Sequence, residues 1–203
     1  MVKGLLIVLS GPSGTGKGTV CKALLRKRSD ISLSISCTTR EPRAGEVDGV
    51  SYFFKSKQEF ESLIEKGEFL EYANVFSNYY GTPKSFVDAA VESGKDVLLE
   101  IDVQGALKVK ASYPEGVYIF LVPPSMEELE KRIRSRGTET PAQIETRLGK
   151  AGAELKLLRE YDYVIVNENV DEVVCKIETI MTAEKLKVSR YEDKLDEQRS
   201  ESL

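Results

Sequence analysis

The amino-acid sequence predicts an α/β fold in which a parallel sheet is flanked by helices. Apolar runs of strand length alternate along the chain with segments that carry helix signals, and this alternation is typical of parallel sheets. A glycine-rich segment directly follows the first apolar run. Two insertions interrupt the alternation, at about residues 37–80 and 127–155, and insertions at the carboxyl edge of a parallel sheet commonly carry ligand sites.

Four apolar runs have the length and composition of buried strands, and a fifth, weaker strand is placed at residues 33–36. The four runs are Leu5–Leu9, Val97–Ile101, Tyr118–Val122 and Tyr163–Val166. The insertion at 37–80 is rich in Tyr, Phe, Gly and charged residues, and we expect short antiparallel strands within it.

Helix signals fill the intervals between the strands. Capping boxes, in which a Ser or Thr and a Glu or Gln three residues later bind each other's N–H groups, mark three of the starts. A Pro in the first turn marks another, and an Asp is expected to cap the last helix. The expected caps or first residues are Gly16 or Lys17, Ser56, Pro83, Ser125, Thr140 and Asp171. We expect the helix that begins at Thr140 to extend toward Arg159.

The length of 203 residues suits one compact domain, with its core at about 1–36, 81–126 and 156–186 and a polar tail at 187–203. The net charge of −4 argues against broad binding to nucleic acid or to an anionic membrane surface. No apolar stretch approaches the ~20 residues that span a bilayer, and no signal peptide is apparent. We therefore expect a cytoplasmic protein without nucleic-acid or membrane partners.

Cysteine and histidine usage narrows the chemistry. The three cysteines, Cys21, Cys37 and Cys175, have no metal-binding spacing and indicate reduced thiols in a reducing cytoplasm. The chain contains no histidine, which excludes Ser-His-Asp and Cys-His catalysis and histidine metal sites. Phosphoryl transfer fits these limits because it depends on positioning and on electrostatic stabilisation.

The glycine-rich segment matches the Walker A pattern G-x4-G-K-[ST] up to its last letter. Its N–H groups, with the helix behind them, are expected to form an anion site. The expected ATP-binding residues are Gly11, Pro12, Ser13, Gly14, Thr15, Gly16, Lys17, Gly18 and Thr19. We expect Lys17 to act as a catalytic group that reaches the outer phosphates. The alternative is an ordinary glycine-rich turn, against which the preceding strand and the following helix argue.

The last position of the Walker A pattern is the one that supplies a hydroxyl ligand to Mg²⁺. Gly18 occupies the position at which a Ser or Thr would bind Mg²⁺, and Thr19 follows one place later. We therefore expect Mg²⁺ to be held mainly by nucleotide phosphates and water, as that ion usually is, and we assign no metal ligand in the chain.

Residues 38–52 read T-T-R-E-P-R-A-G-E-V-D-G-V-S-Y, and this pattern resembles the signature of guanylate kinases, the ATP:GMP phosphotransferases. Further matching segments follow in order at residues 67–71, 78–82, 100–105 and 136–140. The similarity spans about residues 4–183. It implies a P-loop NTPase-type sheet with an inserted lobe for the nucleoside monophosphate and a lid. It also implies that ATP and GMP, with dGMP, are the substrates.

Two arginines in this signature, Arg40 and Arg43, flank Pro42, which holds the turn. Paired guanidinium groups can bind a phosphate in bidentate fashion. The resemblance implies that both arginines, together with the hydroxyls of Tyr52 and Tyr80, bind the GMP phosphate. The alternative is a solvated surface turn.

A carboxylate can accept the two N–H donors of guanine together, and adenine does not present that pair. The resemblance gives this role to Glu71 and places Asp102 near the base. It also makes Ser36 and Thr82 hydroxyl partners. Asp102 ends an apolar strand, as a Walker B carboxylate does. A role toward Mg²⁺, a role toward guanine and a cap on the next helix therefore all stay open for this residue.

The second insertion carries arginines that suit a lid. Arg132 and Arg136 are four residues apart and share a helix face, and Arg147 lies in the next helix. Guanidinium groups on a lid can neutralise the transferring phosphoryl group and exclude water. The resemblance implies this catalytic role for all three arginines. Surface ion pairs with Glu128 and Glu139 are the alternative.

Two other functions stay open from the sequence. Guanylate-kinase-like domains of junctional scaffold proteins bind peptides, although those domains typically lack a complete phosphate loop. A kinase for another nucleoside monophosphate would share the loop and the lid. The adenine contacts are poorly specified, and Asn167, directly after the last strand, is a candidate.

Overall fold

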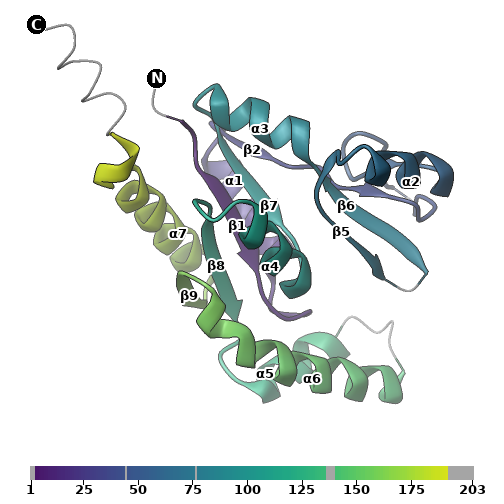
Figure 1. Ribbon diagram of the computed structural model, residues 1–203. Helices are drawn as coiled ribbons and strands as arrows, with labels where there is room; N and C mark the ends of the chain where they lie inside the picture. The colour runs from purple at the N-terminus through teal and green to yellow at the C-terminus, as the bar shows by residue number, and fades with distance from the viewer. Residues whose placement is uncertain (1–2, 44, 76, 136–139, 192–203) are drawn as a thin grey trace, which may run out of the picture.

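A computed structural model describes residues 3–43, 45–75, 77–135 and 140–191. Its main sheet has the strand order β2-β7-β1-β8-β9, and every neighbouring pair of strands is parallel (Figure 1). The strands of this sheet are β1 (Leu6–Ser10), β2 (Ile31–Leu33), β7 (Asp96–Glu100), β8 (Val117–Val122) and β9 (Tyr163–Val166). The predicted parallel α/β fold is therefore confirmed.

Helices cover both faces of the main sheet because its central strands are apolar on both sides. The helices are α1 (Lys17–Lys27), α2 (Lys57–Glu65), α3 (Lys84–Glu92), α4 (Val103–Ser112), α5 (Met126–Arg134), α6 (Pro141–Leu155), α7 (Val170–Lys185) and the short 3-10 turns η1 (Lys156–Glu160) and η2 (Val188–Arg190). Leu5, Ile7 and Leu9 belong to a buried cluster with α1 and α7. Leu6 and Val8 alternate with them and belong to a cluster with α3 and α4 on the other face.

A smaller sheet in the order β4-β3-β6-β5 lies beside the main one (Figure 1). Its strands are β3 (Cys37–Thr38), β4 (Phe53–Phe54), β5 (Phe69–Val75) and β6 (Asn78–Pro83). β6 is antiparallel to both β3 and β5, as expected for this insertion, whereas β3 and β4 run parallel. Phe60 of α2 stacks on Phe69 and Tyr79, with ring centroids 4.5 and 5.2 Å away. These rings attach α2 to the smaller sheet.

The second insertion forms a small hydrophobic cluster of its own. Leu129 and Ile133 of α5 pack with Ile144 and Ala151 of α6. The two helices lie where the carboxyl ends of the main strands point (Figure 1). They can therefore act as one packed unit beside the glycine-rich loop.

Several predicted boundaries differ from the structure. The strand placed at 33–36 runs from Ile31 to Leu33, because beyond it the Ser36 carbonyl accepts the Phe53 N–H and the chain joins the smaller sheet. Pro83 ends β6 in an extended conformation, so α3 begins one residue later. The cap of α7 is Asn169, whose side chain accepts two backbone N–H groups, and not Asp171.

The long helix predicted from Thr140 begins as expected, with the capping box formed. It ends at Leu155, and the 3-10 turn η1 covers the remaining residues. Within the part of the chain that the structure describes, no helix is both long enough and apolar enough to cross a membrane. Most of the polar tail, residues 192–203, lies outside the described residues.

Candidate functional site

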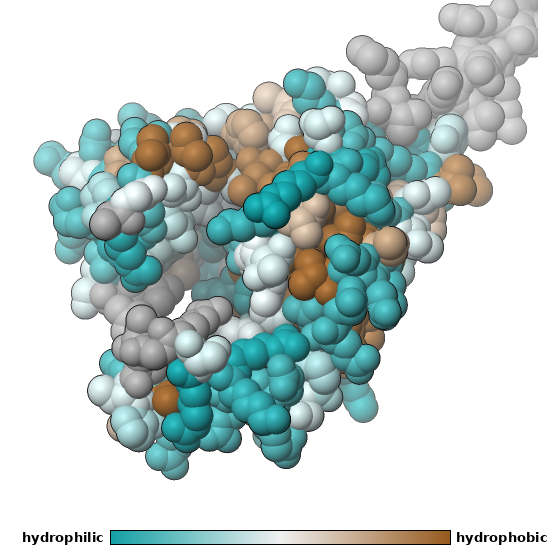
Figure 2. Space-filling view, turned by 180° about the vertical axis from the view of Figure 1, so that it is seen from behind, coloured by the Kyte–Doolittle hydropathy of each residue, from teal (hydrophilic) through white to brown (hydrophobic). Residues whose placement is uncertain are grey.

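Two neighbouring pockets open at the carboxyl ends of β1 and β7. The larger, of about 490 Å³, is bordered by the glycine-rich loop, the start of α1 and one face of α6. The smaller, of about 240 Å³, is bordered by the smaller sheet and the start of α4. Glu100 and Asp102 line both pockets. Seen from behind, the surface is hollowed between the smaller sheet and the α5–α6 pair (Figure 2).

The loop has the backbone that its glycines predict. Gly11, Gly14 and Gly16 have φ values of 143°, 93° and 94°, which L side chains rarely adopt. Gly16 caps α1 without a side chain, so the cap leaves the first N–H groups of the helix to a ligand. Four of the predicted loop residues besides these glycines line the larger pocket: Ser13, Lys17, Gly18 and Thr19. Pro12 and Thr15 are not among its lining residues and act within the loop.

Lys17 lies across the mouth of this loop. Its ammonium donates to the carbonyl oxygens of Gly11 and Pro12, at 2.6 and 3.1 Å. Burial lowers the pKa of Lys17, and the carboxylates of Glu100 and Glu154 oppose that shift in part. A partly desolvated ammonium beside free N–H groups is a strong site for an anion.

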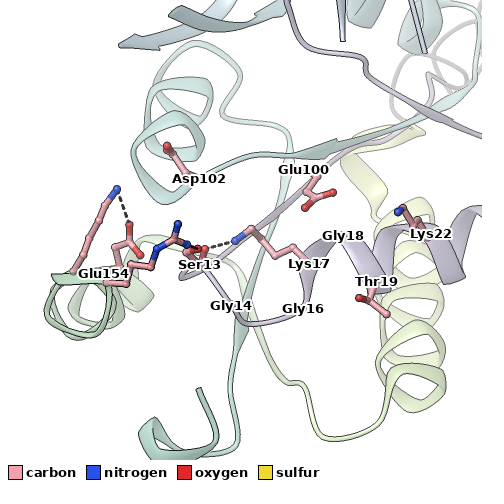
Figure 3. A pocket seen from close by; sticks show the side chains of 13 residues that line it. Ser13, Gly14, Gly16, Lys17, Gly18, Thr19, Lys22, Glu100, Asp102 and Glu154 are labelled. Atoms are coloured by element: carbon pink, nitrogen blue, oxygen red, sulfur yellow. Dashed lines mark hydrogen bonds and ion pairs between the residues drawn. The ribbon is translucent and has the colours of Figure 1, made fainter. Parts of the chain in front are cut away.

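One face of α6 lines the pocket opposite the loop (Figure 3). Arg147, one of the three predicted lid arginines, donates from Nη1 to Ser13 Oγ at 3.1 Å. Lys150 and Glu154 lie three and seven residues further along and share this face. Both were missed from the sequence, although their spacing from Arg147 marks them as its neighbours. Glu154 is buried, and burial raises its pKa while Lys150 and Lys17 oppose the shift.

Arg132 is not brought into the larger pocket. Its Nε donates to Glu128 at 3.0 Å, which is the alternative partner considered from the sequence. Its Nη2 donates to the carbonyl oxygen of Asn167 at 3.1 Å. Arg136, with residues 137–139 of the same motif, lies outside the described residues.

Five of the residues predicted to contact GMP line the smaller pocket: Ser36, Tyr52, Glu71, Tyr80 and Asp102. Among these residues, Glu71 is buried. Its carboxylate accepts a hydrogen bond of 2.9 Å from the Thr82 hydroxyl. Thr82 itself is fully buried, so it serves the pocket through Glu71. A side-chain carbon at Gly105 would lie 3.1 Å from Glu71 Oε2, so this glycine leaves space for the carboxylate.

Burial raises the pKa of Glu71 to about 7, with the Asp102 carboxylate acting in the same direction and the Thr82 hydroxyl opposing it. An ionised Glu71 therefore gains from any ligand that brings N–H donors. The geometry suits a base with two adjacent donors.

Asp102 has two functions in the structure. Its Oδ1 accepts the Gly105 N–H at 2.8 Å and caps α4, as the structural alternative predicts. It also lines both pockets. Glu100, two residues earlier on the strand, was missed as a site residue although it shares both pockets. Burial raises the pKa of Glu100, and Lys17 and Lys22 oppose the shift.

Neither predicted arginine lines the smaller pocket, but Arg40 lies beside it and is held by Glu46. Arg40 Nη2 donates to both carboxylate oxygens of Glu46, at 2.9 and 3.0 Å. The Arg43 N–H donates to the same carboxylate at 2.8 Å, and the Arg43 side chain is exposed. The Arg40 guanidinium lies 5.5 Å from the ring centroid of Tyr52, which lines the pocket. Glu46 was missed as a site residue, although it lies within the signature at residues 38–52.

Among the described residues, no three Asp, Glu or Cys side chains are grouped so that they could hold a metal ion by themselves. The carboxylates that line the larger pocket beside the glycine-rich loop are Glu100, Asp102 and Glu154. Hard carboxylate oxygens of this kind suit Mg²⁺ through its bound waters.

Comparisons with known proteins agree with this geometry. The sequence model described as "Guanylate kinase" matches residues 3–184. Guanylate kinase of Clostridioides difficile is 57% identical over 201 residues, covering 99% of this chain and 98% of that protein. Guanylate kinase of Caldanaerobacter subterraneus subsp. tengcongensis is also 57% identical over 201 residues, with the same coverage.

One solved structure points to the same family, and another shares the fold. A crystal structure of guanylate kinase from Anaplasma phagocytophilum has a TM-score of 0.76 at 39% identity, covering 94% of this chain and 90% of that one. The SH3-kinase fragment of tight junction protein 3 has a TM-score of 0.50 at 10% identity, covering 92% of this chain and 60% of that one, and it shares the fold alone. The chain therefore belongs to the guanylate kinase family.

Proposed function

We propose that this chain transfers the γ-phosphoryl group of ATP to GMP, and also to dGMP, giving ADP and the nucleoside diphosphate. The observation that carries the proposal is the pair of adjoining pockets that share Glu100 and Asp102. One pocket has the chemistry of a phosphate site, and the other has a buried carboxylate suited to guanine. The reaction would serve purine nucleotide metabolism and the recycling of GMP.

In this proposal the loop residues 11–19 bind the ATP phosphates. Main-chain N–H groups of the loop and the first turn of α1 face the phosphate oxygens. Lys17 leaves its carbonyl partners for the outer phosphates, a move supported by its place at the loop mouth. Arg147 approaches from α6, beside Ser13.

The acceptor is bound by its phosphate and by its base. Arg40 and Arg43, with Tyr52 and Tyr80, hold the phosphate of GMP. Glu46 supports this assignment because it fixes the Arg40 guanidinium by two hydrogen bonds. A guanidinium that is already oriented loses less side-chain entropy when it binds a phosphate.

Glu71 reads the base by accepting the N1 and N2 hydrogens of guanine, with Asp102 and Ser36 beside it. Thr82 positions Glu71 through its hydroxyl. Adenine has no N1 hydrogen, so it would leave a buried carboxylate poorly satisfied. The ligand dGMP keeps the same base and phosphate, which is why we include it.

Transfer needs no protein base, because the attacking oxygen belongs to a phosphate that is ionised near neutral pH. This oxygen bonds to the γ-phosphorus, the bond from that phosphorus to the β–γ bridging oxygen breaks, and ADP leaves with the electron pair. Lys17 and Arg147 neutralise the charge on the transferring group. We assign the same role to Arg132 and Arg136, which requires a movement that carries Arg132 away from Glu128.

Bound Mg²⁺ would supply charge neutralisation on the nucleotide phosphates. We propose that phosphates and water are its main ligands, with Glu100 and Asp102 accepting hydrogen bonds from that water.

We also propose three working parts: a core at about 1–36, 81–126 and 156–186, a GMP lobe at about 37–80 and a lid at about 127–155.

We place the reaction in the cytoplasm, with nucleotides as the only partners assigned. The free thiols of Cys21, Cys37 and Cys175 support a reducing compartment.

A nucleotide panel tests the proposal. ADP release from ATP is followed with GMP, dGMP, AMP, UMP and TMP as acceptors under matched conditions. We expect kcat/KM for GMP and dGMP to exceed that for the other acceptors by about 10⁴-fold, the discrimination that buried hydrogen-bonding sites reach. Equal kcat/KM for GMP and another of these monophosphates would contradict the proposed specificity for guanine. Failure to bind ATP or to turn over any acceptor would favour a binding module without activity.

A further inference from the structure

Asn167 touches the phosphate loop without entering the pocket. It directly follows β9 and is 4% exposed. Its side-chain Nδ2 donates to the carbonyl oxygen of Thr15 at 2.7 Å. It is absent from the residues that line the larger pocket. The side-chain amide of Asn167, a candidate adenine contact from the sequence, is therefore hydrogen-bonded to the main chain of the glycine-rich loop.

The backbone of Asn167 is fixed at both of its polar groups. Its N–H donates to the Val122 carbonyl at 2.8 Å, which extends the β8–β9 pairing by one residue. Its carbonyl accepts from Arg132 Nη2 at 3.1 Å. The side chain thus projects from a rigid strand end, which is the kind of support that orients a functional group well.

The bond to Thr15 controls the peptide between Thr15 and Gly16. In a trans peptide the C=O and the N–H point in opposite directions. Holding the Thr15 carbonyl toward Asn167 therefore turns the Gly16 N–H away from Asn167. Gly16 lines the larger pocket, and its N–H is one of the groups that a phosphate would meet.

Gly16 is also shaped by this contact. Its φ is +94°, and a side-chain carbon there would lie 2.5 Å from Asn167 Nδ2. Thr15 closes the other side of the turn, since its hydroxyl donates to the Pro12 carbonyl at 2.9 Å. The loop is consequently held at Thr15 from both directions.

We propose that Asn167 is a positioning residue that aims the Gly16 N–H at the phosphates of the donor nucleotide, and that it is not a ligand of adenine. This inference rests on the proposed function, in which the loop binds the ATP phosphates. Without the Asn167 amide, the Thr15–Gly16 peptide can rotate and the phosphate site loses an oriented donor.

Inorganic tripolyphosphate separates the two roles because it has phosphates and no base. Its binding, and that of ATP and GMP, is measured by titration calorimetry for the wild type, Asn167→Asp and Asn167→Leu. Asn169→Ala is the matched control, since it removes an exposed helix cap two residues away. We expect both Asn167 variants to bind tripolyphosphate and ATP about tenfold more weakly, the loss of one oriented hydrogen bond, with GMP binding unchanged.

Three results would overturn the inference. Weaker ATP binding with unchanged tripolyphosphate binding would identify Asn167 as an adenine contact. Unchanged binding of both would show that the loop does not need the amide. Loss of GMP binding as well, in both variants, would indicate a general structural role. A wild-type chain that does not bind tripolyphosphate would instead contradict the proposed function itself.

Discussion

The two pockets are built by different means. The larger pocket is lined by the glycine-rich loop, by cations of α1 and α6, and by the carboxylates of Glu100, Asp102 and Glu154. The smaller pocket is lined largely by side chains, and two side chains in it or beside it are each held by another side chain. Thr82 holds Glu71, and Glu46 holds Arg40. Main-chain sites depend on backbone conformation, whereas side-chain sites depend on pairs of side chains that the fold brings into contact.

This difference predicts which substitutions will weaken each pocket's ligand binding. A phosphate site made of N–H groups tolerates changes in side chains that neither alter the loop nor supply a cation, as Lys17 and Arg147 do. A base site made of supported carboxylates changes its specificity when either member of a pair is replaced. Substitutions should therefore divide into those that affect every donor nucleotide and those that affect the choice of acceptor.

The largest effect is expected at the loop lysine. Lys17→Ala should lower kcat by at least ~10²-fold, because the transferring phosphoryl group loses an aligned cation. ADP release in a coupled assay measures this change. GMP binding should be retained, since Lys17 does not line the smaller pocket.

Lys27→Ala is the matched control, because this lysine lies at the far end of α1 in an exposed pair with Glu178. Its turnover should equal that of the wild type. Near-normal turnover in Lys17→Ala would contradict the role given to the lysine.

The next effect concerns the base. Glu71→Gln should lower kcat/KM for GMP about 30-fold, since the new amide accepts one guanine N–H and opposes the other with its own. ATP affinity should not change. Glu61→Gln, on the exposed side of α2 in the same lobe, provides the control. An unchanged preference for GMP over AMP in Glu71→Gln would remove Glu71 as the base reader.

Sequence patterns foresaw the main-chain pocket more fully than the side-chain pocket. The G-x4-G-K spacing is local, so it marked the loop and Lys17 without knowledge of the fold. Glu71 and Thr82 meet only because β5 and β6 pair in antiparallel register. No local pattern encodes that contact, and only the resemblance pointed to both residues.

The pH dependence of GMP binding sharpens the comparison further. The pKa of Glu71 is raised to about 7, and bound guanine N–H groups favour its ionised form. GMP binding then releases a proton below pH 7, so Kd for GMP should rise by up to about tenfold per unit as the pH falls. It should level off above pH 7. Calorimetry across this range checks the slope, and a slope that persists in Glu71→Gln would assign it to another group.

The smallest effect is expected from the support of Glu71. Thr82→Val keeps the side-chain shape and removes the hydrogen bond of 2.9 Å. KM for GMP should rise about fivefold, with kcat and ATP affinity near those of the wild type. Thr179→Val, which removes a hydroxyl from α7, should leave KM unchanged. Equal KM values in the two variants would show that Glu71 does not need Thr82.

The elements that the sequence placed well are those fixed by local signals. The capping boxes at Ser56 and Thr140 formed as predicted, whereas at Ser125 the structure shows the side chain accepting the Glu128 N–H without the reciprocal bond. Pro83 was placed in a helix because the pairing of β6 with β5 is not a local property. Arg132 carried a lid motif, yet Glu128, one helical turn away, binds it here. Arginine roles that need a bound phosphate are the part that sequence spacing predicts least well.

A crystal structure with a bisubstrate analogue, in which adenosine and guanosine are joined through their 5′ phosphates, tests the division between the two pockets most directly. The account predicts phosphates against the N–H groups of residues 14–18 and guanine within hydrogen-bond distance of the Glu71 carboxylate. Guanine lying elsewhere, or phosphates that make no contact with the loop, would contradict it.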